Sequence, residues 1–180
     1  VEKDGRALVM TGESGSGKST LAAQLGERGW RLMGDEFALL DLHSGQIFAF
    51  PRLISLKNAA IPVMEVEAAP DRFGPLLRAT AKGDIRHLSP RADAVARMGQ
   101  GAMPALLLFP RYGFAPEIRA VGQGEVFMRL TQASTNYTAL GEPGFTALTR
   151  FVQTVPAHAI DFPSGEDAIA LVEQLWAETQ

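Results

Sequence analysis

Residues 12–19 are the part of the chain whose residue types and spacing most clearly predict chemistry. They read Gly-Glu-Ser-Gly-Ser-Gly-Lys-Ser and satisfy the pattern G-x-x-x-x-G-K-[ST]. Glycine permits backbone angles that turn successive N–H groups toward one centre, and such a nest binds anions. The segment therefore predicts a cradle for a polyphosphate. We expect the nucleotide-binding residues to be Gly12, Glu13, Ser14, Gly15, Ser16, Gly17, Lys18, Ser19 and Thr20.

Two side chains of this segment have separate expected roles. Lys18 would reach the β- and γ-phosphates as a mobile positive charge, so it is a candidate catalytic residue. The Ser19 hydroxyl would be a ligand of Mg²⁺, a hard cation that prefers oxygen. The competing interpretation is a glycine-rich turn that carries a surface lysine. We favour nucleotide binding because the pattern lies between a predicted strand and a predicted helix, as a phosphate loop must.

An adjacent pair of carboxylates, Asp35 and Glu36, follows the next predicted strand. Open α/β sheets bind ligands at the carboxyl ends of their strands, so both side chains are expected to face the phosphates. In phosphoryl transfer one carboxylate can hold Mg²⁺ while a second orients or deprotonates the attacking hydroxyl. We therefore expect Asp35 to be a metal ligand and both residues to be catalytic. The alternative is that one of them is a solvated strand end.

The elements that must position these residues form a predicted α/β fold. Residues 7–10 are a short apolar run, 18–28 have helical spacing, and 30–33 form a second strand. This alternation argues for parallel strands, because parallel neighbours need a crossover connection. We expect a P-loop nucleotide-binding domain with a mixed, mostly parallel sheet flanked by helices. Two β-like runs at 37–41 and 46–50, separated by turn residues, predict an inserted β-hairpin.

The rest of the chain supplies the remaining strands and helices. Residues 105–109 predict a central strand that Pro110 ends, and the last strand is expected at 157–162. Ser164 is expected to cap the final helix, with Asp167 three residues further on. Other expected elements are a short strand at 52–57, a weak helix at 58–68 interrupted by Pro62, a strand at 86–88, and helices at 90–98, 125–133 and 145–152.

Length, charge and composition exclude several classes of protein. The 180 residues suit one domain spanning 1–180, and because the chain begins with Val1 rather than Met we expect an excised piece of a longer protein. A net charge of −3 gives no global basic field that would attract nucleic acid or anionic lipid. No apolar run approaches the length needed to cross a bilayer. The chain has no cysteine, which fits a reducing compartment, so we expect a cytoplasmic protein without nucleic-acid or membrane partners.

Longer phrases of the sequence resemble the catalytic domain of HPr kinase/phosphorylase, a bacterial enzyme that phosphorylates a serine of a phosphocarrier protein. The phosphate loop, the helix that runs into Arg28-Gly29, the following Arg31-Leu32 and the acidic pair are similar to that family. The resemblance is closer to the smaller HprK-related kinase A group and spans most of the chain. The phrases that carry it are residues 35–40, 51–58, 109–112 and 136–137.

The resemblance implies a kinase with a sheet like that of phosphoenolpyruvate carboxykinase, with ATP and Mg²⁺ as cofactors and a protein or peptide hydroxyl, typically serine, as acceptor. It places Lys18, Ser19 and Asp35 at matching positions. Glu36 replaces the second aspartate of HPr kinase, which is assigned to proton transfer, and is longer by one methylene. HPr itself is a doubtful substrate, because the glycine-rich signature that helps define the HPr-facing site has no match. Assembly as a homo-oligomer is a further expectation, since HPr kinases form hexamers.

Four further residues are candidate phosphate or acceptor contacts. Arg52 and Lys57 flank a short predicted strand within one of the family phrases, with surface charge as the alternative. His87 is a candidate acid/base group because imidazole ordinarily titrates near neutrality, with a structural histidine as the alternative. Arg111 directly follows the predicted strand 105–109, so it is expected at the sheet edge, either as a charge-stabilising group or as an ion-pair partner.

Three functions stay open at this point. The first is an ATP-dependent kinase that transfers the γ-phosphate to a hydroxyl of a protein or peptide. The second is a regulatory module or ATPase that binds nucleotide without making a phosphorylated product. The third is a small-metabolite kinase, because acceptor sites are built from loops that the sequence does not place. The sequence has no Asn-Lys-x-Asp phrase of the kind guanine-binding GTPases use, which favours ATP over GTP.

Overall fold

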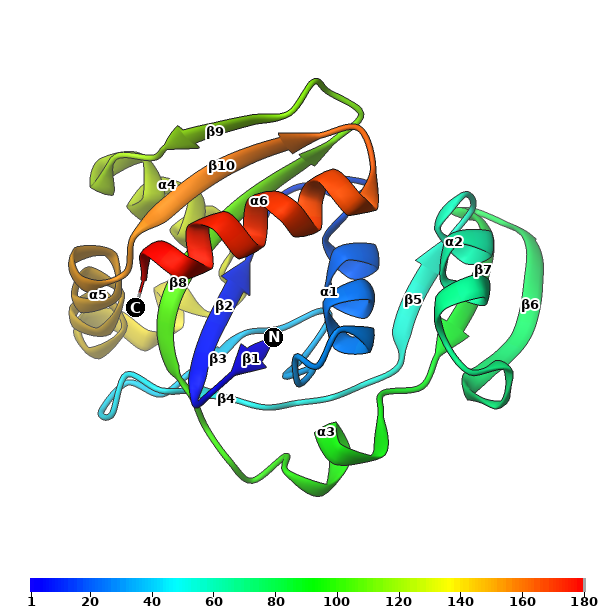
Figure 1. Cartoon of the computed structure of the whole chain (residues 1–180). Coiled ribbons are helices and arrows are strands. Elements are labelled where there is room, and N and C mark those ends of the chain that lie inside the picture. The colour runs from blue at the N-terminus through cyan, green and yellow to red at the C-terminus, as the bar shows by residue number, and fades with distance from the viewer. Residues whose placement is uncertain (180) are drawn as a thin grey trace.

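The computed structural model describes residues 1–179 and is built around a five-stranded, mostly parallel sheet (Figure 1). Its order is β1-β2-β8-β10-β9, in which β2, β8 and β10 run parallel and the two edge strands are antiparallel. The carboxyl ends of the three parallel strands therefore meet at one edge of the sheet. The strands are β1 (Glu2–Lys3), β2 (Arg6–Met10), β8 (Met103–Tyr112), β9 (Glu117–Ala120) and β10 (Ala157–Phe162).

Helices cover both faces of this sheet because its central strands are apolar on both sides. In β8, Leu106 and Leu108 belong to one buried cluster, whereas Leu107 and Phe109 belong to another. The first cluster packs against α1 and α6, and the second packs against α4 and α5 (Figure 1). These helices are α1 (Lys18–Glu27), α4 (Gln123–Ala133), α5 (Tyr137–Thr154) and α6 (Gly165–Glu178).

A second, three-stranded sheet lies beyond α1, so that α1 is packed between the two sheets (Figure 1). Its order is β5-β7-β6 with antiparallel pairs, and Ile54 and Leu56 of β5 join the same buried cluster as Leu25 of α1. The elements of this part are β5 (Ile54–Lys57), α2 (Ala60–Glu67), the 3-10 turn η1 (Pro70–Arg72), β6 (Phe73–Thr80), β7 (Gly83–Leu88) and α3 (Ala92–Ala96). A small hairpin of β3 (Leu39–Leu40) and β4 (Ile47–Phe48) precedes it.

Several expected elements are confirmed. The inserted hairpin forms as the antiparallel pair β3–β4, although each strand has only two residues. The last strand covers the expected residues, and α4 overlaps the expected helix almost completely. Ser164 caps α6, with its hydroxyl accepting a hydrogen bond from the Asp167 amide at 3.2 Å. Elements with a local capping or apolar signal were therefore placed well from the sequence.

The expected second strand at 30–33 is wrong. That segment is extended but forms only one bridge, between Arg31 and Glu2. The physical reason is β1, which the sequence did not predict: β1 pairs with β2 at that edge, so residues 30–33 meet β1 instead. The segment still runs in the direction of β2, because the bridge to β1 and the β1–β2 pair are both antiparallel. Asp35 consequently leaves this segment near the carboxyl edge of the sheet.

The prediction that Pro110 ends the central strand is also wrong, because β8 continues to Tyr112. The pairing of β8 with β2 stops at Leu108, so the strand needs no amide hydrogen toward β2 at position 110. Beyond that point β8 continues beside β10 alone, with Pro110 opposite Ile160. The two extra residues carry Arg111 and Tyr112 past the core to the edge of the sheet.

Other differences concern element ends. Pro62 lies in the first turn of α2, where its missing amide hydrogen has no intrahelical partner to lose, so it does not interrupt the helix. The helix expected at 90–98 shortens to α3, and α5 starts well before residue 145 and bends at Gly141 (φ 56°). Strands β6 and β9 were not predicted. Within residues 1–179, no helix is both long and apolar enough to cross a membrane.

Candidate functional site

The glycine-rich loop connects the carboxyl end of β2 to α1 at the edge where the parallel strands end. Gly12, Gly15 and Gly17 have φ values of 150°, 88° and 95°, which only glycine adopts freely. Gly17 is the N-cap position of α1 and offers no side-chain cap. The amides of the first helical turn, which includes Lys18, Ser19 and Thr20, therefore have no intrahelical acceptor. Together these features make a helix terminus whose free amides are suited to an anion.

The Lys18 side chain folds back over this loop. Its ammonium group donates hydrogen bonds to the carbonyl oxygens of Gly12 and Glu13 at 2.7 and 2.6 Å, and to the Ser16 hydroxyl at 3.2 Å. Burial lowers the pKa of Lys18, while the negative charge of Asp35 raises it and the positive charge of Lys57 lowers it further. The structure thus brings Lys18, Asp35 and Lys57 within electrostatic reach of one another.

A pocket beside the loop is lined by Lys18, Asp35 and Glu36 together with residues 7–10 of β2. The Asp35 Oδ2 atom accepts a hydrogen bond from the Ser55 amide at 3.3 Å, which ties the carboxylate to β5. Its other oxygen, Oδ1, is buried and has no hydrogen-bond partner. A buried carboxylate oxygen without a partner is costly unless something binds it, so this atom is suited to a cation.

Glu36 is exposed and forms an ion pair with Arg52, with Oε2 and Nη1 3.0 Å apart. More than half of each side chain is exposed, so the pair contributes little to stability. The Arg52 guanidinium also lies over the Phe50 ring, 5.9 Å from its centroid. The structure therefore joins two sequence-predicted site residues to each other, of which Glu36 lines the pocket and Arg52 does not.

Lys57 and His87 come from the three-stranded sheet. Lys57 is the last residue of β5 and is half-buried, and its positive charge lowers the pKa of Lys18. His87 is in β7 opposite Ser55, the residue whose amide binds Asp35. Neither Lys57 nor His87 is among the described residues that line the pocket. Lys57 is therefore close enough to the site for its charge to affect Lys18, whereas His87 is on β7, the strand next to β5.

Arg111 is held by an ion pair. Its guanidinium donates two hydrogen bonds to Asp161, which is 2 % exposed and also contacts Arg119. Hydrogen bonding from Arg111 lowers the pKa of Asp161, against the opposing effect of burial. Of the two roles expected from the sequence, the ion-pair partner is the one the structure shows. Arg111 also lies 3.9 Å from the centroid of the Phe114 ring.

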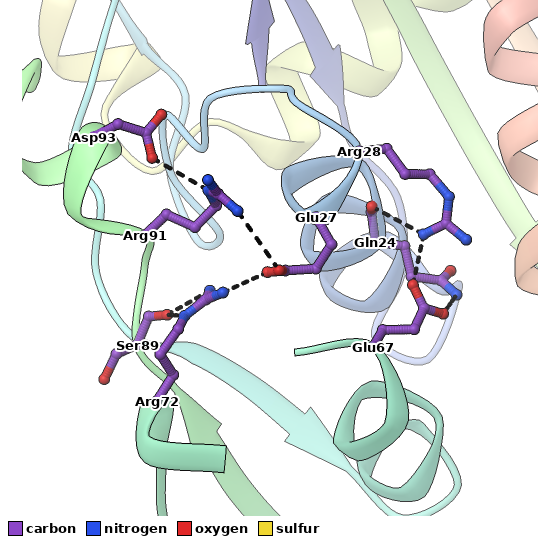
Figure 2. A network of polar contacts seen from close by, with 8 residues as sticks. All are labelled: Gln24, Glu27, Arg28, Glu67, Arg72, Ser89, Arg91 and Asp93. Carbon is purple, nitrogen blue, oxygen red and sulfur yellow. Dashed lines mark hydrogen bonds and ion pairs between the residues drawn. The ribbon is translucent and has the colours of Figure 1, made fainter. Parts of the chain in front are cut away.

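A network of ion pairs that the sequence did not predict anchors the three-stranded sheet to the C-terminal end of α1 (Figure 2). The Glu27 carboxylate accepts a hydrogen bond from Arg72 at 2.6 Å and lies 3.8 Å from Arg91. The next residue, Arg28, pairs with Glu67 of α2 at 2.5 Å. These contacts join α2, η1 and the segment after β7 to α1, the helix that begins at Lys18.

Metal ligands in this region are few. Among residues 1–179 there is no group of three or more His, Asp or Glu side chains that could hold a metal ion by itself. The pocket offers the free Oδ1 atom of Asp35, whereas the Ser19 hydroxyl is in the first turn of α1 and is not among the residues that line the pocket. A divalent ion here would need oxygens from a bound phosphate and from water to complete its shell.

Comparisons with known proteins give no guide to this site: no family model, no curated protein and no solved structure matches the chain.

Proposed function

We propose that the glycine-rich loop is a P-loop and that the chain is an ATP-dependent kinase, which transfers the γ-phosphate to a hydroxyl of a protein or peptide. The observation that carries the proposal is the common pocket of Lys18, Asp35 and Glu36 beside a helix terminus whose free amides are suited to an anion. A cation, a metal-binding carboxylate and a second carboxylate next to a phosphate cradle are the groups that phosphoryl transfer requires.

Polyphosphate binding is supported by the state of the loop. The three hydrogen bonds of Lys18 all go to loop acceptors, so the ammonium is already at the mouth of the cradle. A phosphate anion placed there would offer Lys18 charged acceptors in place of neutral carbonyls, and charge-assisted hydrogen bonds are roughly twice as strong. Lys18 would then exchange its partners without leaving the loop.

Magnesium fits the donor set at the pocket. The unpartnered Oδ1 atom of Asp35 is buried, and oxygen is the donor type that Mg²⁺ selects. Asp35 and Ser19 would hold the ion, which when bound neutralises charge on the phosphate oxygens. Asp35 is itself held by the Ser55 amide through its other oxygen, so its free oxygen has a fixed direction.

Glu36 is the residue we propose for the acceptor hydroxyl. Its carboxylate is exposed at the rim of the pocket, where a substrate hydroxyl can approach, and Arg52 holds it by an ion pair. In that position the carboxylate accepts the hydroxyl proton as the oxygen attacks the γ-phosphate. The choice of a protein or peptide acceptor rests on the resemblance to HprK-related kinases, and a small metabolite is the competing acceptor.

Magnesium dependence tests the proposal. We expect ATP to bind the wild-type chain more tightly with Mg²⁺ than without it, and ADP to form slowly in its presence, measured by calorimetric titration and a product assay. Asp35→Asn should bind ATP without Mg²⁺ as the wild type does, but lose most of the gain that Mg²⁺ gives. Equal ATP affinity with and without Mg²⁺ in both proteins would contradict the metal role, and no ATP binding at all would contradict the kinase.

A regulatory module or ATPase that binds nucleotide without making a phosphorylated product is the second candidate, and the Glu36–Arg52 ion pair favours it because the proposed base already has a partner. Replacing Glu36 by glutamine separates the two functions. If Glu36 accepts the proton, Glu36→Gln should lower ADP formation roughly 10²–10⁴-fold, the usual contribution of a general base, with ATP affinity little changed. Unchanged turnover or partner binding in Glu36→Gln would favour the regulatory module.

A further inference from the structure

The two flanks of the glycine-rich loop are chemically different. Sheet order places β1, with the segment leading to Asp35, on one side of β2, and β8 and β10 on the other. The first flank carries the charged pocket of Lys18, Asp35 and Glu36. On the second flank the loop rests against aromatic side chains from the ends of β8 and β10. A Cβ atom built on Gly17 would lie 3.1 Å from Phe162 Cζ and 3.4 Å from Tyr112 Cβ.

Tyr112 has an exposed aromatic ring that lies beside the buried ring of Phe162. It is 54 % exposed at the end of β8, while Phe162 beside it is 2 % exposed. The two ring centroids are 6.1 Å apart at an interplanar angle of 57°. Tyr112 therefore has one edge against the core and much of its surface free. Its neighbour Phe114 differs, because the Arg111 guanidinium lies over that ring and Asp161 holds Arg111 in turn.

We infer that Tyr112 is the stacking platform for the base of the bound nucleotide, a role that rests on the proposed nucleotide binding. In a nucleoside triphosphate the γ-phosphate and the nucleoside are at opposite ends of the phosphate chain. If the γ-phosphate faces Asp35 and Glu36, the nucleoside therefore leaves the loop on the opposite flank. That flank is where Tyr112 is exposed. Stacking on an aromatic ring suits any base, since every base has a π-face. The ring thus gives affinity for the nucleoside, while Lys18 and the loop give affinity for the phosphates.

Comparison of ATP with inorganic tripolyphosphate tests this role, because the two ligands share the phosphates and differ in the nucleoside. Wild-type chain with Mg²⁺ should bind ATP more tightly than tripolyphosphate. Tyr112→Ala should weaken ATP binding roughly 5- to 150-fold, the range that loss of one stacked base gives, and leave tripolyphosphate affinity unchanged. Tyr112→Phe, which keeps the ring, should bind both ligands as the wild type does. Phe145→Ala, at a similarly exposed ring on α5, is the matched control and should change neither affinity.

Three results would overturn the inference while leaving the phosphate site intact. ATP affinity unchanged in Tyr112→Ala would show that the ring does not contact the base. An equal loss for ATP and tripolyphosphate would show that Tyr112 only supports the loop. Equal affinities of the wild type for ATP and tripolyphosphate would show that the nucleoside adds nothing. Absence of binding to either ligand by the wild type would instead overturn the proposed nucleotide binding, and this inference with it.

Discussion

Lys18→Met should reduce ADP formation roughly 10²–10³-fold, the usual loss when one fixed donor to developing negative charge is removed. Methionine is similar in length to lysine but has neither the charge nor the three hydrogen bonds that Lys18 makes in the loop. ATP binding should weaken for the same reason. The chain should stay folded, because burial lowers the pKa of Lys18 and so disfavours the charged amine that the substitution removes. A calorimetric titration and an ADP assay on the same preparations measure both effects.

Lys82→Met is the matched control for this variant. Lys82 is an exposed residue in the turn between β6 and β7, so it carries the same substitution outside the site. Its turnover and ATP affinity should equal those of the wild type. If Lys18→Met also turned over at the wild-type rate, the loop would not be the site of phosphoryl transfer. If both variants lost activity alike, the effect would come from the loss of one positive charge from the chain and not from the position of Lys18.

The candidate site was predictable to the extent that its residues are close in sequence. The loop pattern, its place between β2 and α1, and the acidic pair could all be assigned from short segments. Contacts between residues far apart in the sequence could not be assigned in this way. Asp161, which holds Arg111, is 50 positions away, and only the register of β8 with β10 brings the two together. An arginine that leaves a strand therefore looks the same in the sequence whether it binds phosphate or a buried carboxylate.

The errors in the fold have a similar cause. Residues 30–33 have the apolar composition of a strand, but whether they pair with β2 depends on β1, a two-residue element without any periodic signal. Pro110 has no amide hydrogen and therefore disfavours a strand locally. The pairing of β8 with β2 ends before position 110, however, so no hydrogen bond to β2 is needed there. Tyr112 was missed as a site residue for the same reason, because it reaches the loop only when β8 continues past the proline.

Arg31→Leu should cost about 3–5 kcal/mol of unfolding free energy, because it breaks a buried ion pair by removing one partner. Arg31 Nε donates to Glu2 Oε2 at 2.5 Å, and both side chains are 2 % exposed. The terminal nitrogens of Arg31 donate to the carbonyl oxygens of Arg97 and Gln100, each at 3.0 Å. The leucine variant keeps the Glu2 carboxylate buried and removes the Arg31 donors from both carbonyls, of which the Arg97 carbonyl keeps the Gln100 amide at 2.9 Å.

The pH dependence of this loss identifies its cause. Burial alone would raise the pKa of Glu2, but hydrogen bonds from Arg31 and from the Gly5 amide hold it below its ordinary value. In the wild type the stability from this pair is therefore present above the unfolded pKa and is lost as the pH falls through the folded one. Without Arg31, only the Gly5 amide and Arg97, 3.3 Å from Glu2 Oε2, oppose the effect of burial on the pKa of Glu2, so that pKa should rise and acid should relieve part of the penalty. The difference between wild type and Arg31→Leu should narrow as the pH falls toward about 4.3, where the variant's penalty is relieved, and further below it, where the wild type loses its stabilisation.

Urea unfolding of both proteins at pH 7 and near pH 4 measures this difference, with the double variant Glu2→Gln plus Arg31→Leu as the direct control. The double variant should recover part of the loss at pH 7, because it has no buried charge to leave unpaired. Arg129→Leu removes an exposed partner of Glu125 and a guanidinium that lies 4.7 Å from the centroid of the Phe109 ring, and should change stability by only about 1 kcal/mol. If Arg31→Leu cost no more than Arg129→Leu, the buried pair would not hold the segment before Asp35 against β1, and the position of Asp35 would need another cause.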